Sequence, residues 1–125
     1  MTSKRDHRDF DARVPPDAVL SRILDAGRLA GSARNRQPWT FFVARREARE
    51  RLAPVVYVPR MIMAAPVAVA IAVDGTGSAM SGFDAGRAAQ NMMLAAWAEG
   101  VASCPNGIAD PDAARAVLGL APTQV

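Results

Sequence analysis

The segment from Phe83 to Gly100 limits what this chain can fold into, because it predicts a long helix that is apolar almost all round. Its apolar members are Phe83, Ala85, Ala88, Ala89, Met92, Met93, Leu94, Ala95, Ala96 and Trp97. Such a helix is stable only where other elements cover most of its surface. The chain has 125 residues, enough for one domain with one core and too few for two. We therefore expect a partner subunit to complete the cover of this helix.

The rest of the chain predicts alternating helices and strands. A helix begins at Val14-Pro15-Pro16-Asp17, because proline suits the first turn and Asp17 complements the positive helix end. Gly31 ends that helix, and Trp39 to Val43 and Pro66 to Val73 predict strands. The other segments are a loop at Gly31 to Pro38, a helix at Arg45 to Leu52, an ambiguous stretch at Pro54 to Met63, a flexible connection at Asp74 to Gly82, a short strand at Val101 to Cys104, a turn at Pro105 to Gly107 and a helix at Asp110 to Leu118 capped by Asp110.

Composition excludes several classes of protein. Half of the residues are hydrophobic and the mean hydropathy is +0.04, which is typical of a globular chain rather than a disordered one. The longest apolar run, Ala64 to Val73, is far shorter than the roughly 20 residues of a membrane-spanning helix. The N-terminus is polar and Cys104 is the single cysteine. A cytoplasmic location is the expectation from these features.

The basic residues give little support to a nucleic-acid interface. Lys4 is the only lysine among 15 basic residues, yet the formal net charge is only +3 and aromatics make up 6% of the chain. Stacking aromatics between cations are what such an interface needs. The charged helix at Arg45 to Leu52 is interpreted as a solvated surface, and a nucleic-acid-binding module is the least favoured hypothesis.

Conventional catalytic motifs are missing from the sequence. His7 and Cys104 are single residues without metal-ligand spacing, so we expect no metal site and no catalytic side chain. The sequence also lacks the glycine patterns of Rossmann and P-loop nucleotide sites. Cofactor chemistry, if present, must therefore depend on other residues.

Three polar clusters stand out in this apolar chain. Lys4-Arg5-Asp6-His7-Arg8 offers cationic donors suited to a phosphate, although a solvated tail explains it as well. Ser32-Ala33-Arg34-Asn35-Arg36-Gln37-Pro38-Trp39 places two side-chain amides in a loop, where amides can bond a heterocycle or simply form a turn. Ser103-Cys104-Pro105-Asn106-Gly107 exposes backbone amides beside a glycine, which permits close approach of a planar ligand.

Taken together and in this order, the clusters resemble the flavin-dependent nitroreductase family. The resemblance is carried by the basic lead before Val14-Pro15-Pro16-Asp17, by "AGSARNRQPWTFFV" from Ala30, and by "FDAGRAAQNMMLAAWAEGVASCPNG" from Phe83. It implies an α+β fold, a mixed β-sheet flanked by helices, with the long buried central helix at the interface of an intertwined homodimer. It also implies one FMN in each of two sites at that interface.

The resemblance assigns cofactor-binding roles to three groups of residues. The basic lead implies FMN phosphate and ribityl contacts from Lys4, Arg5, Asp6 and Arg8. The amide loop implies contacts to the flavin from Ala33 (through its backbone), Asn35 and Gln37. The turn implies backbone donors to the redox-active side of the flavin from Pro105, Asn106 and Gly107. Asp6 stands where the family has a hydroxyl, and its carboxylate would repel a phosphate unless Arg5 or Arg8 pairs with it.

The function implied is that of an oxidoreductase in which NAD(P)H passes hydride to FMN, and a nitroaromatic, quinone or similar acceptor is then reduced in a ping-pong cycle. Positioning and electrostatics would be the contribution of the protein. Residues 1–125 are expected to form a single domain that lacks the family's last strand and C-terminal arm. The alternative is therefore a truncated, catalytically impaired member that retains only the dimerising core.

Overall fold

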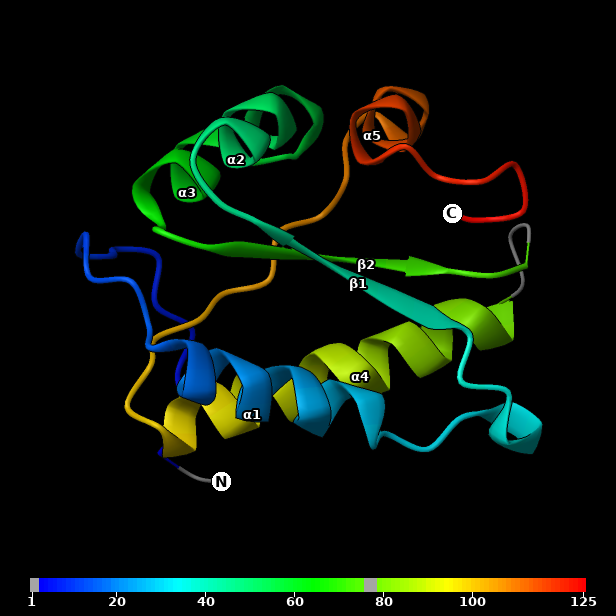
Figure 1. Cartoon of the computed structure of the whole chain (residues 1–125), viewed down its shortest axis with the longest axis horizontal. Helices are drawn as coiled ribbons and strands as arrows, with labels where there is room; N and C mark the ends of the chain where they lie inside the picture. The colour runs from blue at the N-terminus through cyan, green and yellow to red at the C-terminus, as the bar shows by residue number, and fades with distance from the viewer. Residues whose placement is uncertain (1–2, 76–78) are drawn as a thin grey trace.

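In the computed structural model, which describes residues 3–75 and 79–125, two strands separate two layers of helices (Figure 1). Helices α1 and α4 lie on one side of the strands, and α2, α3 and α5 lie on the other. The elements are α1 (Asp17–Arg28), η1 (Ala33–Asn35), β1 (Trp39–Ala44), α2 (Glu47–Leu52), η2 (Ala53–Val55), α3 (Pro59–Ala64), β2 (Ala68–Val73), α4 (Ala79–Ala98) and α5 (Pro111–Leu118). The helix, strand and helix predicted between Asp17 and Leu52 are confirmed.

The two strands pair antiparallel, with Trp39 opposite Val73 at one end and Ala44 opposite Ala68 at the other. Val73 also exchanges two backbone hydrogen bonds with Val125, of 2.8 and 3.0 Å, on the outer edge of β2. The α+β class is confirmed. In the described part of the chain the sheet consists of β1 and β2, which are antiparallel. The resemblance implied a mixed sheet.

Two local predictions need correction. The segment from Val101 to Cys104 is not a strand, because the backbone bonds described for it, from Val101 N to Ala96 O (2.8 Å) and from His7 N to Ser103 O (3.2 Å), do not make a ladder. Ala79–Gly82 belongs to α4 rather than to the connection after β2, so that helix begins four residues before Phe83. Residues 76–78 of the predicted connection lie outside the described residues. The ambiguous stretch at Pro54 to Met63 forms η2 and most of α3.

Close packing of α1 against α4 depends on Gly27. A Cβ at that position would lie 2.7 Å from the Met92 sulfur and 3.0 Å from Cζ of Phe41. Without a side chain there, Met92 of α4 packs into a core with Ile23, and this core continues to the sheet through Phe41 and Val69. Glycine at this helix position therefore allows three elements to meet at one point.

A second core lies on the opposite face of the sheet. It is formed by the buried residues Ala44, Leu52, Val55, Val56 and Ala114. Helix α5 is placed over this core by the predicted cap, since the Asp110 side chain accepts the Ala113 N–H at 3.0 Å. Gly119 closes the helix in the left-handed conformation, with φ of 63°.

Helix α4 is covered on one face only. Ala88, Met92 and Ala96 are buried at intervals of four residues, whereas Phe83 is 62% exposed and Met80 48% exposed. Glu99, just beyond the helix, forms an ion pair with Arg22 of α1 (2.5 Å), and this hydrogen-bonded pair lowers the pKa of the Glu99 carboxyl. None of the helices in the described part of the chain combines the length and apolarity that a membrane span requires.

Truncation of Met92 to alanine tests the placement of α4. Met92 is 7% exposed, so we expect Met92→Ala to lower the free energy of unfolding by about 2–5 kcal/mol. Met63→Ala is the matched control, because Met63 is 46% exposed on α3 and its loss should cost less than about 0.5 kcal/mol. Urea unfolding followed by circular dichroism measures both. Equal losses in the two variants would contradict the observed packing.

Candidate functional site

The basic lead and the turn at Pro105 to Gly107 lie on the same side of the chain. The His7 N–H donates to the Ser103 carbonyl, and the His7 ring stacks on Trp97 with centroids 5.8 Å apart. The Trp97 indole N–H donates in turn to the Ser3 hydroxyl at 3.3 Å. These contacts hold the lead, which has no regular secondary structure of its own, against the C-terminal end of α4.

Within the lead, Asp6 is neutralised by Lys4. The two side chains form an ion pair, and the Lys4 side chain is only 11% exposed. The sequence indicates Arg5 and Arg8 as the residues that could offset Asp6, and the structure shows that Lys4 pairs with it. Lys4 and Asp6 therefore offset each other's charge, and Arg5 and Arg8 are exposed cations of the same lead.

The turn at Pro105 to Gly107 is fixed to the segment that precedes α3. The Asn106 side chain accepts the Val58 N–H at 3.1 Å and donates to the Val58 carbonyl at 2.9 Å. The Tyr57 N–H donates to the Gly107 carbonyl at 2.9 Å, and a Cβ on Gly107 would lie 2.8 Å from the Tyr57 ring. The Asn106 side chain is thus structural. Any donor role of this turn falls to the N–H groups of Asn106 and Gly107, which no hydrogen bond among the described residues uses.

The amide loop, Ser32 to Gln37, is bonded mainly to itself. The Gln37 backbone N–H donates to the Ser32 hydroxyl at 2.8 Å, and its side-chain amide donates to Asn35 Oδ1 at 3.0 Å. Arg34, Asn35 and Gln37 have φ of 54°, 54° and 50°, in the left-handed region. Each such residue costs about 1–3 kcal/mol, so this conformation persists only where its surroundings enforce it.

Asp84 is the residue that sequence reasoning missed. It lies on α4, is 2% exposed, and accepts the Ala33 N–H on Oδ2 at 2.9 Å. Its other oxygen, Oδ1, is buried and has no hydrogen-bond partner among the described residues. A usable signal was present in the sequence, because Asp84 is the only acidic residue between Phe83 and Ala98.

The candidate residues divide into two groups at opposite ends of α4. The amide loop contacts α4 at Asp84, and the basic lead contacts it at Trp97. These positions are about 13 residues apart, which corresponds to about 20 Å along a helix. Figure 1 shows the same separation, with η1 at the right end of α4 and the start of the chain at the left end. The structure brings the lead and the turn together and leaves the amide loop apart.

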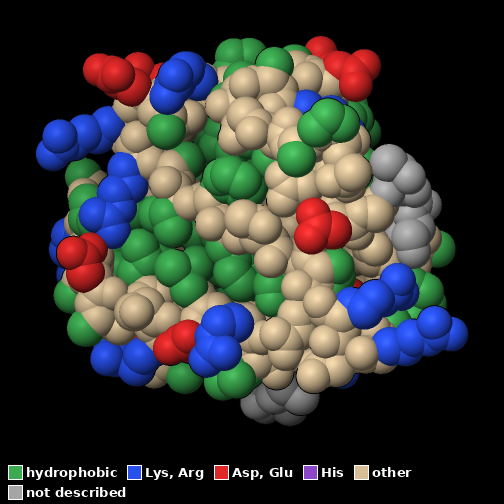
Figure 2. All heavy atoms as spheres, turned by 45° about the vertical axis from the view of Figure 1, so that its right-hand side comes forward, with side chains coloured by type: hydrophobic (Ala, Val, Ile, Leu, Met, Phe, Trp, Pro, Cys, Tyr) green, Lys and Arg blue, Asp and Glu red, His purple; other side chains and the backbone are tan. Residues whose placement is uncertain are grey.

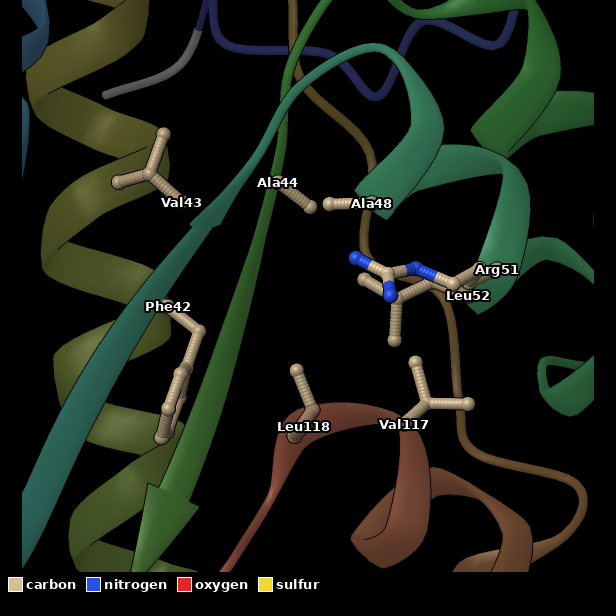
Figure 3. Close-up of a pocket in the computed structure, with 8 residues that line it drawn as sticks. All are labelled: Phe42, Val43, Ala44, Ala48, Arg51, Leu52, Val117 and Leu118. Carbon is tan, nitrogen blue, oxygen red and sulfur yellow. The ribbon is translucent and has the colours of Figure 1, made fainter.

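Two of the hollows on the described part of the surface lie near elements discussed above. One, of about 280 Å³, is lined by His7, Trp97, Gly100, Val101 and Ala102, and it adjoins the basic lead. The other, of about 150 Å³, is lined mostly by apolar side chains of β1, α2 and α5, with Arg51 beside them (Figure 3). Figure 2 shows hydrophobic side chains gathered in one area of the surface with charged groups around them. None of the predicted site residues lines either hollow.

The donor set fits a phosphate-bearing ligand with a planar ring. Exposed arginines in the lead suit a phosphate, and the N–H groups of the adjacent turn and the amides of the loop suit a heterocycle. Residues 3–75 and 79–125 contain no group of three or more His, Cys, Asp or Glu side chains able to hold a metal ion. The arrangement therefore supports binding and electrostatic stabilisation of such a ligand.

The chain is similar to known proteins of one family. The sequence matches the Nitroreductase family over residues 1–59 and 57–125. It is 33% identical over 112 residues to a protein named as an NADH dehydrogenase/NAD(P)H nitroreductase from Methanothermobacter thermautotrophicus. That match covers 86% of this chain and 59% of the relative, so the chain spans less than two thirds of that relative's length.

Solved structures show the same fold. A nitroreductase family protein from Clostridium novyi NT has a TM-score of 0.88 to this chain, with 16% sequence identity. The match covers 98% of this chain and 75% of the Clostridium chain. A nitroreductase from Desulfovibrio desulfuricans, crystallised in complex with FMN, is 29% identical with a TM-score of 0.73. That match covers 78% of this chain and 60% of the Desulfovibrio chain.

Removal of the Asn106 side chain tests how the turn is held. Asn106→Ala removes both bonds to Val58 and leaves two part-buried backbone groups unpaired, so we expect a loss of about 1–3 kcal/mol in unfolding free energy. Asn91→Ala is the control, since the exposed Asn91 amide makes one long bond of 3.3 Å to Ala26. Chemical denaturation should give a clearly smaller loss for the control. Similar losses would show that the clamp does not stabilise the turn.

Proposed function

Because the chain belongs to the nitroreductase family, we propose that it is an FMN-dependent oxidoreductase whose flavin site is shared between two copies of the chain. The proposal is supported by the match to the Nitroreductase family and by the FMN complex of the Desulfovibrio relative. The chain spans only 59% of the length of its archaeal relative, so its activity, electron acceptor and partner are part of this proposal.

The separation of the candidate residues along α4 carries the proposal of a shared site. The lead and the turn lie at one end of this helix and the amide loop at the other, about 20 Å away by helical rise. A two-fold axis across the open face of α4 would bring the amide loop of one protomer to the lead of its partner. The exposed Phe83 and Met80 on α4 supply apolar area for such an interface.

Each group of residues has a role toward bound FMN. We assign the phosphate to Arg5 and Arg8, because both are exposed and a guanidinium group can donate two hydrogen bonds to phosphate oxygens. The backbone N–H groups of Asn106 and Gly107 would donate to the flavin ring, where fixed donors stabilise developing negative charge. The amide loop would come from the other protomer. Because the Ala33 N–H of that loop already donates to Asp84, the side chains of Asn35 and Gln37 would line the ring.

The redox chemistry belongs to the cofactor. When bound, FMN would supply this chemistry, with hydride from NAD(P)H in one half of a ping-pong cycle and reduction of a nitroaromatic, quinone or similar acceptor in the other. The chain contributes binding, orientation and fixed donors, and we assign no side chain as a general acid or base. A single domain over residues 1–125, located in the cytoplasm, is part of the proposal, and one unpaired cysteine is compatible with that compartment.

Thermal unfolding with FMN tests the cofactor assignment. Free FMN at one hundred times its dissociation constant should stabilise the folded chain by about 2.7 kcal/mol. Arg8→Ala should weaken FMN binding by about tenfold to a hundredfold, because it removes a charge-assisted bond to phosphate. Arg45→Ala is the control, since Arg45 is an exposed arginine that pairs with Asp17 and has no assigned contact with FMN. A dimer that gains no stability with FMN would favour the impaired dimerising core instead.

Mixed dimers test whether the site is shared. One chain carries Arg8→Ala and the other carries Asn35→Ala with Gln37→Ala, so each homodimer has only damaged sites. In a mixed dimer with shared sites, one site combines an intact lead with an intact amide loop, and tight FMN binding should return there. Light scattering and FMN titration follow assembly and binding. If mixing restores no tight binding although mixed dimers form, the site lies within one chain.

A further inference from the structure

We infer that Asp84 is a positioning residue for the flavin site, because it holds the amide loop in the backbone conformation that presents Asn35 and Gln37. The inference rests on the proposed function, since it assigns that loop to FMN. Asp84 itself lies behind the loop, buried on α4 at 2% exposure. It acts on the ligand only through the loop.

One hydrogen bond ties this loop to the rest of the fold. Asp84 Oδ2 accepts the Ala33 N–H at 2.9 Å. The other hydrogen bonds described for Ser32 to Gln37 are internal, among them Asn35 N–H to the Ser32 carbonyl and Arg36 N–H to the Ala33 carbonyl. Among the described residues, the carboxyl group on α4 is therefore the only hydrogen-bonding anchor of the loop to another element.

The loop needs such an anchor because its backbone is strained. Arg34, Asn35 and Gln37 all adopt positive φ, a region that asparagine tolerates but that residues such as Arg34 and Gln37 adopt rarely and at a cost. Release of Ala33 would let these residues return to ordinary backbone conformations. The Asn35 and Gln37 side chains would then lose the mutual hydrogen bond that orients them.

The acceptor atom, rather than the negative charge, is what the loop uses. Asp84 Oδ1 is buried without a hydrogen-bond partner, so only one of its two oxygens contacts the loop through a hydrogen bond. An asparagine has the same shape and keeps one carbonyl oxygen for the Ala33 N–H. Asp84→Asn should therefore preserve the loop, whereas Asp84→Ala should release it.

Hydrogen exchange in the FMN-free protein tests the anchor directly. The Ala33 amide should be protected in the wild type and in Asp84→Asn, and should exchange at least tenfold faster in Asp84→Ala. Asp112→Ala, which removes an exposed carboxylate from α5, should leave this exchange unchanged. Should Asp84→Ala fail to fold, Asp84→Ser replaces it, because a serine hydroxyl is too short to reach the Ala33 amide. Continued protection of Ala33 in either short variant would overturn the inference.

FMN titration tests the consequence for the site. We expect Asp84→Ala to weaken FMN binding by about tenfold to a hundredfold, and Asp84→Asn and Asp112→Ala to bind within about twofold of wild type. Wild-type affinity in Asp84→Ala despite fast Ala33 exchange would overturn the positioning role, and so would an Asp84→Asn protein as weak as Asp84→Ala. Absence of FMN binding in the wild type would instead refute the proposed function, while the exchange measurement still reports on the anchor.

Discussion

Contact between α1 and α4 at Gly27 is the constraint on which the rest of the structure depends. Because Gly27 has no side chain, Met92 can occupy the space between the helix and Phe41 of β1. This single crossing fixes α4 relative to both α1 and the sheet. The position of α4 then determines where its two ends, and the segments that contact them, are placed.

The same helix explains how a chain without catalytic motifs can contribute to a redox site. Its first third holds the amide loop through Asp84, and its last turns hold the basic lead through Trp97. The site that we propose requires both groups, and two copies of the chain would therefore build it. In such a site the protein supplies donors and geometry, and the electron transfer belongs to the cofactor.

Polar groups near the site serve mainly to hold its backbone. Asn106 uses both atoms of its amide on Val58, Lys4 neutralises Asp6, and the Ala33 N–H is committed to Asp84. The groups that we assign to the ligand are exposed guanidinium groups, backbone N–H donors of the turn and the side-chain amides of the loop. This division lets a short chain keep a defined turn and a strained loop with few elements around them.

Local patterns in the sequence were sufficient for α1, β1, α2, α5 and the Asp110 cap, because proline, capping and apolar spacing act over a few residues. They also identified three polar clusters and the apolar character of α4. Only the tertiary structure decided that Val101 to Cys104 is not a strand and that Asp84 anchors a loop 51 residues away. Those outcomes depend on which segments pack together in space, and contacts between distant segments leave no periodic signal in the sequence.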